Sequence, residues 1–265
     1  GTARLVGATV GGDLSFASAS VARPGGQAIN AGRAHVTGSL FLTEGFRSTG
    51  EVRLGGVTVG GALSCTASRF ANPAGIAVDA NRAKVTGSVL LRDGFAAEGE
   101  VRLLGSVIGG DLDARGADLA HEGGNALDAS TAQVAGGVFL DHGFTARGTV
   151  RLVGLAAGTE LGCGGGRFAG GGDGAAALDA SAARITGRIA IHQGFRAEGL
   201  VALRGTTAGT LRDDRASWPA VLDLDGFRYG ALSCPAADRG WRARREWLRR
   251  QQEPTAHAYA QLAAV

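Results

Sequence analysis

The chain repeats itself with a period of about 49 residues, and each repeat divides into two similar halves. The segment Glu-Val-Arg-Leu at residues 51–54 returns at residues 100–103, and related segments occupy 149–152 and 200–203. Each half contains two aliphatic residues separated by a variable, a small and a variable residue. This pattern starts at Val10, Val36, Val59, Val85, Ile108, Val134, Ala157, Ile185 and Ala208. The structural unit is therefore about 23–26 residues long, and units of this kind stack as repeats.

Apolar residues within a unit recur at every second position, as at Val36, Leu40 and Leu42, which indicates strands. Many of the 46 glycines punctuate these strands at turns. The sequence predicts an all-β fold, a right-handed parallel β-helix of about nine coils over residues 1–235, with a short α-helical cap over 236–265. A kelch-type propeller would not explain the equivalent half-repeats. The patterns of leucine-rich repeats and of hexapeptide helices are missing.

The predicted register turns isolated residues into columns that follow the axis of the rod. Six positions before the aliphatic starts, arginine alternates with asparagine or aspartate. This column contains Arg4, Asn30, Arg53, Asp79, Arg102, Asp128, Arg151 and Asp179. Opposite charges on adjacent strands stabilise a sheet, so we interpret the column as a structural charge ladder. Two further columns are predicted to be core, one with Cys65 and Cys163 and one made largely of phenylalanine.

One edge of the predicted rod carries polar pairs just before recurring Gly-Phe dipeptides. Candidate catalytic residues on this edge are Asp141, His142 and His192, with Arg92 and Asp93 beside them. An acid, a base and a cation on one edge would suit general acid–base chemistry, and a solvated row of turns is the structural alternative. Loops at residues 23–26, 72–75, 121–124 and 169–175 should project from alternate coils and offer a place for a partner to dock.

Cofactor and metal motifs are missing from the sequence. There is no phosphate-binding loop, no dinucleotide fingerprint, no His-Glu-x-x-His and no paired Cys-x-x-Cys. We therefore expect neither a cofactor nor a metal site. The sequence contains no run of 18 apolar residues, so it predicts no membrane-spanning helix.

The last 28 residues differ from the coils. Residues 238–250 contain six arginines and two carboxylates, around Trp241, Trp247 and Leu248. We expect a helix with Trp241 and Leu248 on its apolar face, ended by Pro254, and a second helix from Thr255 to Val265. The first role that we expect for these C-terminal helices is to cap the rod. Arg242, Arg245 and Arg249 are candidates for binding a partner or an anionic membrane surface. Nucleic acid is a weaker expectation, because the charge lies in one helix and not along the rod.

The repeats resemble a group of actinobacterial β-helical proteins. The similarity rests on Val-Arg-Leu-Leu-Gly and Ile-Gly-Gly-Asp-Leu within residues 101–112, and on the endings around 224–229, 247–251 and 259–265. Proteins of that group are often labelled membrane-associated oxidoreductases. The resemblance implies that activity, a chain continuing beyond Val265 and a membrane-proximal tail. The Val-x-Gly-x-Leu pattern is also similar to that of bactofilins, which polymerise through their β-helices.

The leading functional hypothesis is a non-catalytic scaffold or binding protein, acting through its loop edge or by end-to-end association. The first alternative is an enzyme with a groove on the rod, acting on a polysaccharide or a small molecule. The second is the membrane-associated oxidoreductase that the resemblance implies. Partners would then be another protein or further copies of this chain, and the expected location is the cytoplasm, with or without contact to a membrane.

Overall fold

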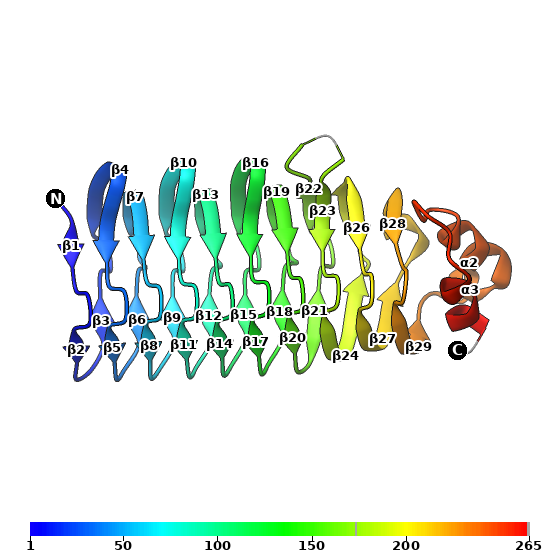
Figure 1. The fold of residues 1–265 in the computed structure, drawn as a ribbon, viewed down its shortest axis with the longest axis horizontal. Coiled ribbons are helices and arrows are strands. Elements are labelled where there is room, and N and C mark those ends of the chain that lie inside the picture. Colours follow the sequence, from blue (N-terminus) through cyan, green and yellow to red (C-terminus); the bar gives the residue numbers. More distant parts are fainter. Residues whose placement is uncertain (173, 264–265) are drawn as a thin grey trace.

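The chain folds into a straight rod, seen in a computed structural model that describes residues 1–172 and 174–263. The N-terminus lies at one end of the rod and a group of helices at the other (Figure 1). Every strand pairing is parallel, between successive turns of the chain. The predicted parallel β-helix is confirmed, and ten strands follow one another along its first sheet, so the coils number about ten.

Sheet A supplies one side of the rod. Its strands follow one another in the order β1 (Ala3–Arg4), β4 (Ser20–Asn30), β7 (Arg47–Arg53), β10 (Arg69–Asp79), β13 (Ala96–Arg102), β16 (Asp118–Asp128), β19 (Thr145–Arg151), β23 (Ala176–Asp179), β26 (Leu200–Ala202) and β28 (Val221–Asp223). The short strands β22 (Arg167–Ala169) and β25 (Arg196–Glu198) extend the same sheet beside this path.

Sheet B supplies the rest of the wall, mostly as two short strands in each coil. Its strands are β2 (Thr9–Val10), β3 (Leu14–Ser15), β5 (His35–Val36), β6 (Leu40–Phe41), β8 (Thr58–Val59), β9 (Leu63–Ser64), β11 (Lys84–Val85), β12 (Val89–Leu90), β14 (Val107–Ile108), β15 (Leu112–Asp113), β17 (Gln133–Val134), β18 (Val138–Phe139), β20 (Ala156–Ala157) and β21 (Glu160–Gly162). The last three are longer: β24 (Arg184–Ile191), β27 (Thr207–Asp213) and β29 (Arg228–Ser233).

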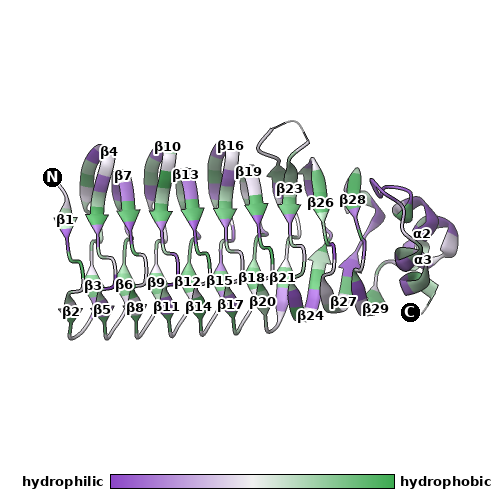
Figure 2. Ribbon diagram, viewed as in Figure 1, coloured by the Kyte–Doolittle hydropathy of each residue, from purple (hydrophilic) through white to green (hydrophobic). Residues whose placement is uncertain are grey.

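The register of the coils agrees with the columns expected from the sequence. All nine predicted aliphatic starts pair in order, from Val10 opposite Val36 to Ile185 opposite Ala208. The column then continues to Tyr229, which the sequence pattern did not include. Hydrophobic and hydrophilic residues alternate along the strands (Figure 2), because neighbouring side chains point to opposite faces.

Aromatic rings fill the interior of the rod. Phe70 lies between Phe46 and Phe95, with ring centroids 5.4 Å from each. Phe168 lies between Phe144 and Phe195 at 5.2 and 5.1 Å. These rings are fully or almost fully buried, so the phenylalanine column is a packed core.

Three projecting loops interrupt the register of sheet A in alternate coils (Figure 1). The pairing shifts between Ala22 and Gln27, between Ala71 and Ile76, and between Ala120 and Asn125. The segments between these positions are the predicted loops 23–26, 72–75 and 121–124. A fourth loop, 170–175, lies between β22 and β23, and its Asp173 is outside the described residues. We call these four segments the loop row.

Glycines in the neighbouring coils make room for the first three loops. Gly50, Gly99 and Gly148 have φ angles of 102°, 116° and 128°, and a Cβ on any of them would collide with carbonyl oxygens of the adjacent loop. Within the loops, Asn72 Nδ2 donates to Ile76 O at 2.8 Å, and the His121 ring lies 2.9 Å from Asn125 O. The first three loops therefore lie directly against the neighbouring coils, and a hydrogen bond within the loop closes two of them.

The C-terminal end of the rod is covered by short helices. They are η1 (Arg215–Ser217), α1 (Ala236–Arg239), α2 (Trp241–Leu248) and α3 (Ala256–Ala263). The expected helix was predicted to end at Pro254, but α2 ends at Leu248. Its buried face was also predicted wrongly, because Trp241 is 65% exposed and Arg244 is fully buried beside Trp247 and Leu248. Residues 264 and 265 of the expected second helix lie outside the described residues.

Candidate functional site

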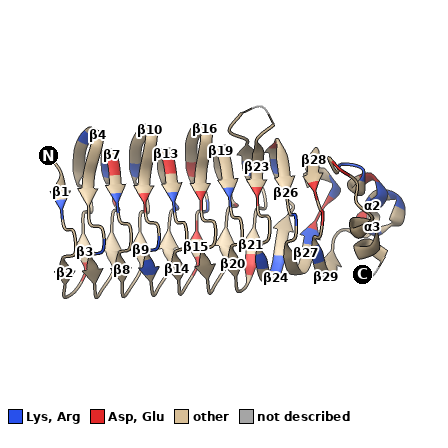
Figure 3. Ribbon diagram, viewed as in Figure 1, with Lys and Arg blue, Asp and Glu red and all other residues tan. Residues whose placement is uncertain are grey.

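The ladder residues lie in consecutive strands of sheet A, each opposite the next. The pairing runs through Arg4, Asn30, Arg53, Asp79, Arg102, Asp128, Arg151 and Asp179. Basic and acidic residues alternate at the ends of these strands in Figure 3. Within the ladder, Arg53 Nε lies 3.9 Å from Asp79 Oδ2, whereas Arg102 makes a 2.7 Å ion pair with Glu100 of its own strand.

The acidic ladder residues also cap the turns that follow them. Oδ1 of Asp79, Asp128 and Asp179 accepts the backbone N–H two residues later, at 3.1, 2.9 and 3.0 Å. In these coils a residue with a side chain adopts positive φ one step further on, at Arg82, Thr131 and Ala182. Coils with arginine in the ladder have glycine there instead, at Gly56, Gly105 and Gly154. The alternation thus follows two kinds of turn, because an aspartate cap stabilises the strained one.

The five candidate catalytic residues lie in three separate local arrangements. Arg92 contacts Asp93 at 3.4 Å and Asp113 of the next coil at 3.3 Å. Asp141 Oδ1 lies 2.9 Å from Nδ1 of its neighbour His142. His192 lines a different hollow near the cap. The lining of that hollow includes none of the other four candidates.

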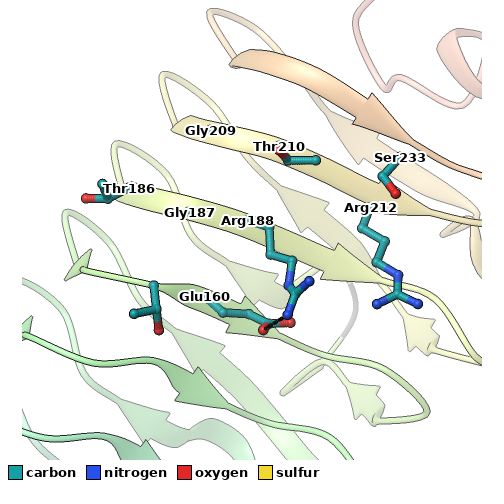
Figure 4. A pocket seen from close by; sticks show the side chains of 9 residues that line it. Glu160, Thr186, Gly187, Arg188, Gly209, Thr210, Arg212 and Ser233 are labelled. Carbon is teal, nitrogen blue, oxygen red and sulfur yellow. Dashed lines mark ion pairs between the residues drawn. The ribbon is translucent and has the colours of Figure 1, made fainter.

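A hollow lies on sheet B, next to the polar edge (Figure 4). We call it the trough. It has a volume of about 540 Å³ and runs across β21, β24, β27 and β29. Glu160 and Arg188 face each other from adjacent strands, with Arg188 Nη2 2.9 Å from Glu160 Oε2. Gly187 and Gly209 contribute no side chains to its wall, while Thr210 and Ser233 add hydroxyls. This chemistry suits a polar ligand.

A second hollow of about 300 Å³ continues the trough toward the cap, since both are lined by Arg212 and Ser233. His192, Asp214 and Cys234 complete its wall. Partial burial and the nearby Arg212 cation lower the pKa of His192 below its ordinary value of 6.5. The imidazole is therefore neutral at pH 7 and can accept a proton or a hydrogen bond there.

The electrostatic link between His192 and Arg212 leads to a testable prediction. Replacing Arg212 by glutamine removes a cation that disfavours protonation, so the pKa of His192 should rise toward its ordinary value. Titration of the histidine ring signals by NMR measures the change directly. Arg167→Gln, at an exposed position of sheet A, removes the same charge as a control and should leave the His192 midpoint in place. An unchanged midpoint in Arg212→Gln would contradict the assignment.

The sequence analysis did not single out Arg212 and Asp214, although both follow the predicted start Ala208 in its coil. It missed the place of Cys234 because Ala208 was the last predicted start. Extending that column by one coil to Tyr229 would have placed β29 beside β27 and Cys234 at this edge. The other two cysteines are core residues, as expected. Burial raises the pKa of Cys65 to about 12 and also raises that of Cys163, so both thiols stay protonated.

The three arginines proposed for partner binding, Arg242, Arg245 and Arg249, are all exposed on α2 and its end. Their neighbour Arg244 is not available to a partner. Its guanidinium makes two hydrogen bonds to Asp213, at 2.6 and 2.7 Å, and lies against the rings of Trp218 and Trp247. The arginines of α2 therefore lie in two different environments, one buried and one exposed.

Within residues 1–172 and 174–263, no group of three or more histidine, cysteine, aspartate or glutamate side chains could hold a metal ion. The helices of the same residues are too short or too polar to cross a bilayer. Comparison of the chain with protein-family models, with curated proteins and with solved structures finds no match.

Proposed function

We propose that the chain is a non-catalytic scaffold that binds protein partners, other copies of itself included, along its loop row. The loop row is the observation that carries this proposal. Pro24, Pro73 and Glu122 are exposed loop residues in alternate coils, about 10 Å apart at the usual strand spacing. Repeated contacts on a stiff support favour an extended or repeated partner, because each added contact strengthens the others.

The arrangement of the polar edge supports the same proposal. Arg92 and Asp141 are engaged with neighbouring side chains and His142 is 72% exposed. General acid–base catalysis requires an acid and a base that reach the same reacting group. The ion pairs on this edge instead join residues next to each other in sequence or in adjacent coils. End-to-end association of the rods is the second contact that we propose for such a scaffold.

Site-specific photo-crosslinking in the native host tests the loop row. A photoreactive amino acid at Gly25, Ala74 or Glu122 should give crosslinked protein products. His35, Lys84 and Gln133 form a matched control set, because they also recur in alternate coils but lie on sheet B. Crosslinks from the loop positions and none from the sheet B positions are expected. Absence of loop crosslinks, or equal yields from both sets, would contradict the proposal.

The alternative is an enzyme that works in the trough on a polysaccharide or small molecule. The observation that favours it is a neutral His192 beside Arg212 at the end of that trough. Turnover that is lost in His192→Gln, with the coils intact by circular dichroism, would favour this alternative. Flavin or haem absorbance in the purified protein would favour the oxidoreductase. Sedimentation with anionic vesicles that requires Arg242, Arg245 and Arg249 would support membrane contact through α2.

A further inference from the structure

Another hollow, distinct from the trough and from its continuation, lies on the turns after the sheet A strands in the N-terminal half of the rod. It has a volume of about 800 Å³ and is lined by four arginines, Arg4, Arg33, Arg53 and Arg82. All four are exposed. Asp79 is the only carboxylate in its lining. We call this hollow the arginine groove.

The four arginines come from four successive coils, one from each. Arg4 and Arg53 belong to the ladder column. Arg33 and Arg82 belong to the turn column that follows, where backbone hydrogen bonds such as Arg33 N–H to Gly55 O join the coils. The aliphatic part of the Arg33 side chain lies over a glycine of the next coil, since a Cβ on Gly56 would stand 3.4 Å from Arg33 Cγ. Cationic groups therefore follow the groove at about one for each 4.8 Å of rise.

The charge in the groove departs from the balance found in the later coils. Where the later coils have Asp128 in the ladder, the second coil has the neutral Asn30. Where the later coils have Thr131 and Ala182 in the turn column, the early coils have Arg33 and Arg82. Compared with the later coils, the early coils thus lack one acid in the ladder column and have two additional cations in the turn column.

The local ion pairs leave most of this charge free. Among the described residues, Arg53 is the groove arginine with a carboxylate partner, at 3.9 Å from Asp79. Arg4, Arg33 and Arg82 make no ion pair within the part of the chain that the structure describes. Four cations along one groove repel one another unless an anion lies between them.

We propose that the arginine groove binds a linear oligophosphate. Guanidinium groups bind phosphate oxygens through paired hydrogen bonds, and a file of them matches a chain of phosphates better than a single anion. The groove lining contains no aromatic residue on which a nucleobase could stack. A phosphate chain without bases is therefore the ligand class that this surface fits.

Calorimetric titration of the full chain with inorganic tripolyphosphate and with a longer inorganic polyphosphate tests the proposal. The double variant Arg33→Ala/Arg82→Ala should bind at least tenfold more weakly, with a shallower salt dependence, because two phosphate contacts are lost. Alanine suits these positive-φ positions, since Ala182 occupies the same column with a φ of 57°. Asn30→Asp should also weaken binding. Its carboxylate keeps the acceptor for Gly32 N–H while restoring the charge seen in later coils.

The matched control is Arg47→Ala/Arg69→Ala, which removes the same charge from two exposed, directly paired positions of sheet A. This variant should bind polyphosphate as the unaltered chain does. Equal weakening in both double variants would show attraction to net charge alone and would overturn the proposal. So would a lack of binding by the unaltered chain. An oligothymidylate that binds as tightly as polyphosphate of equal charge would overturn the choice of a ligand without bases.

Discussion

The variant Arg244→Leu is expected to unfold the C-terminal cap while leaving the coils folded. Arg244 is fully buried and its guanidinium is held by both carboxylate oxygens of Asp213. Asp213 is itself buried and also accepts a hydrogen bond from Trp218 Nε1 at 2.9 Å. Leucine would leave the aspartate charge buried without its cation. Breaking a buried pair on one side costs about 3–5 kcal/mol, and the loss falls on the cap because Arg244 lies in α2.

The tryptophans make this outcome directly measurable. Trp218, Trp241 and Trp247 all lie in the cap region, so tryptophan fluorescence reports on the cap and far-UV circular dichroism on the strands. In Arg244→Leu the fluorescence transition should move to lower temperature, ahead of the loss of strand signal. Arg245→Leu, an exposed neighbour on α2, removes the same charge and should leave the fluorescence transition in place.

A compensating variant separates the buried charge from lost packing. In Asp213→Asn/Arg244→Leu the uncompensated charge is gone, and asparagine still accepts the Trp218 hydrogen bond. Part of the lost stability should return, because a neutral pair removes the desolvation cost of an isolated ion. If the double variant is no more stable than Arg244→Leu, the ion pair is not what holds the cap on the rod.

The coils could be predicted from the sequence almost to the residue. A parallel β-helix repeats the same backbone path, so one alignment of half-repeats places each column. The nine starts from Val10 to Ala208 pair as expected, and so do the ladder residues from Arg4 to Asp179. Sequence periodicity is informative here because packing and hydrogen bonding both repeat with the coil.

The cap and the sites could not be predicted from the alignment of half-repeats. Arg244 and Asp213 are 31 residues apart, and a local pattern of arginines in a helix suggests a solvated face. One lining residue of the trough, Ser233, comes from a final coil whose column residue is Tyr229 and not an aliphatic one. The arginine groove combines two columns, of which the sequence comparison identified only the ladder. Neighbours in different columns become visible only when the turns are placed in space.

The variant Gly109→Ala is expected to destabilise the rod strongly, although it adds a single methyl group. A Cβ at this position would collide with the carbonyl oxygen of Thr86 in the preceding coil. The backbone there is also held by hydrogen bonds from Gly109 N–H to Val85 O at 2.8 Å and from Gly110 N–H to Gly87 O at 2.9 Å. The corner cannot move away without losing them. We expect a loss of about 3 kcal/mol, at the upper part of the range for overpacked sites.

Gly11 provides a control for this substitution in the same column of the rod. The column passes through Gly11, Thr37, Gly60, Thr86 and Gly109, and a Cβ on Gly11 would meet nothing within 4 Å. Gly11→Ala should therefore change stability by less than about 0.5 kcal/mol. Urea unfolding followed by far-UV circular dichroism compares the two midpoints. If both variants unfold at the same urea concentration, the close approach of successive coils does not determine where this chain requires glycine.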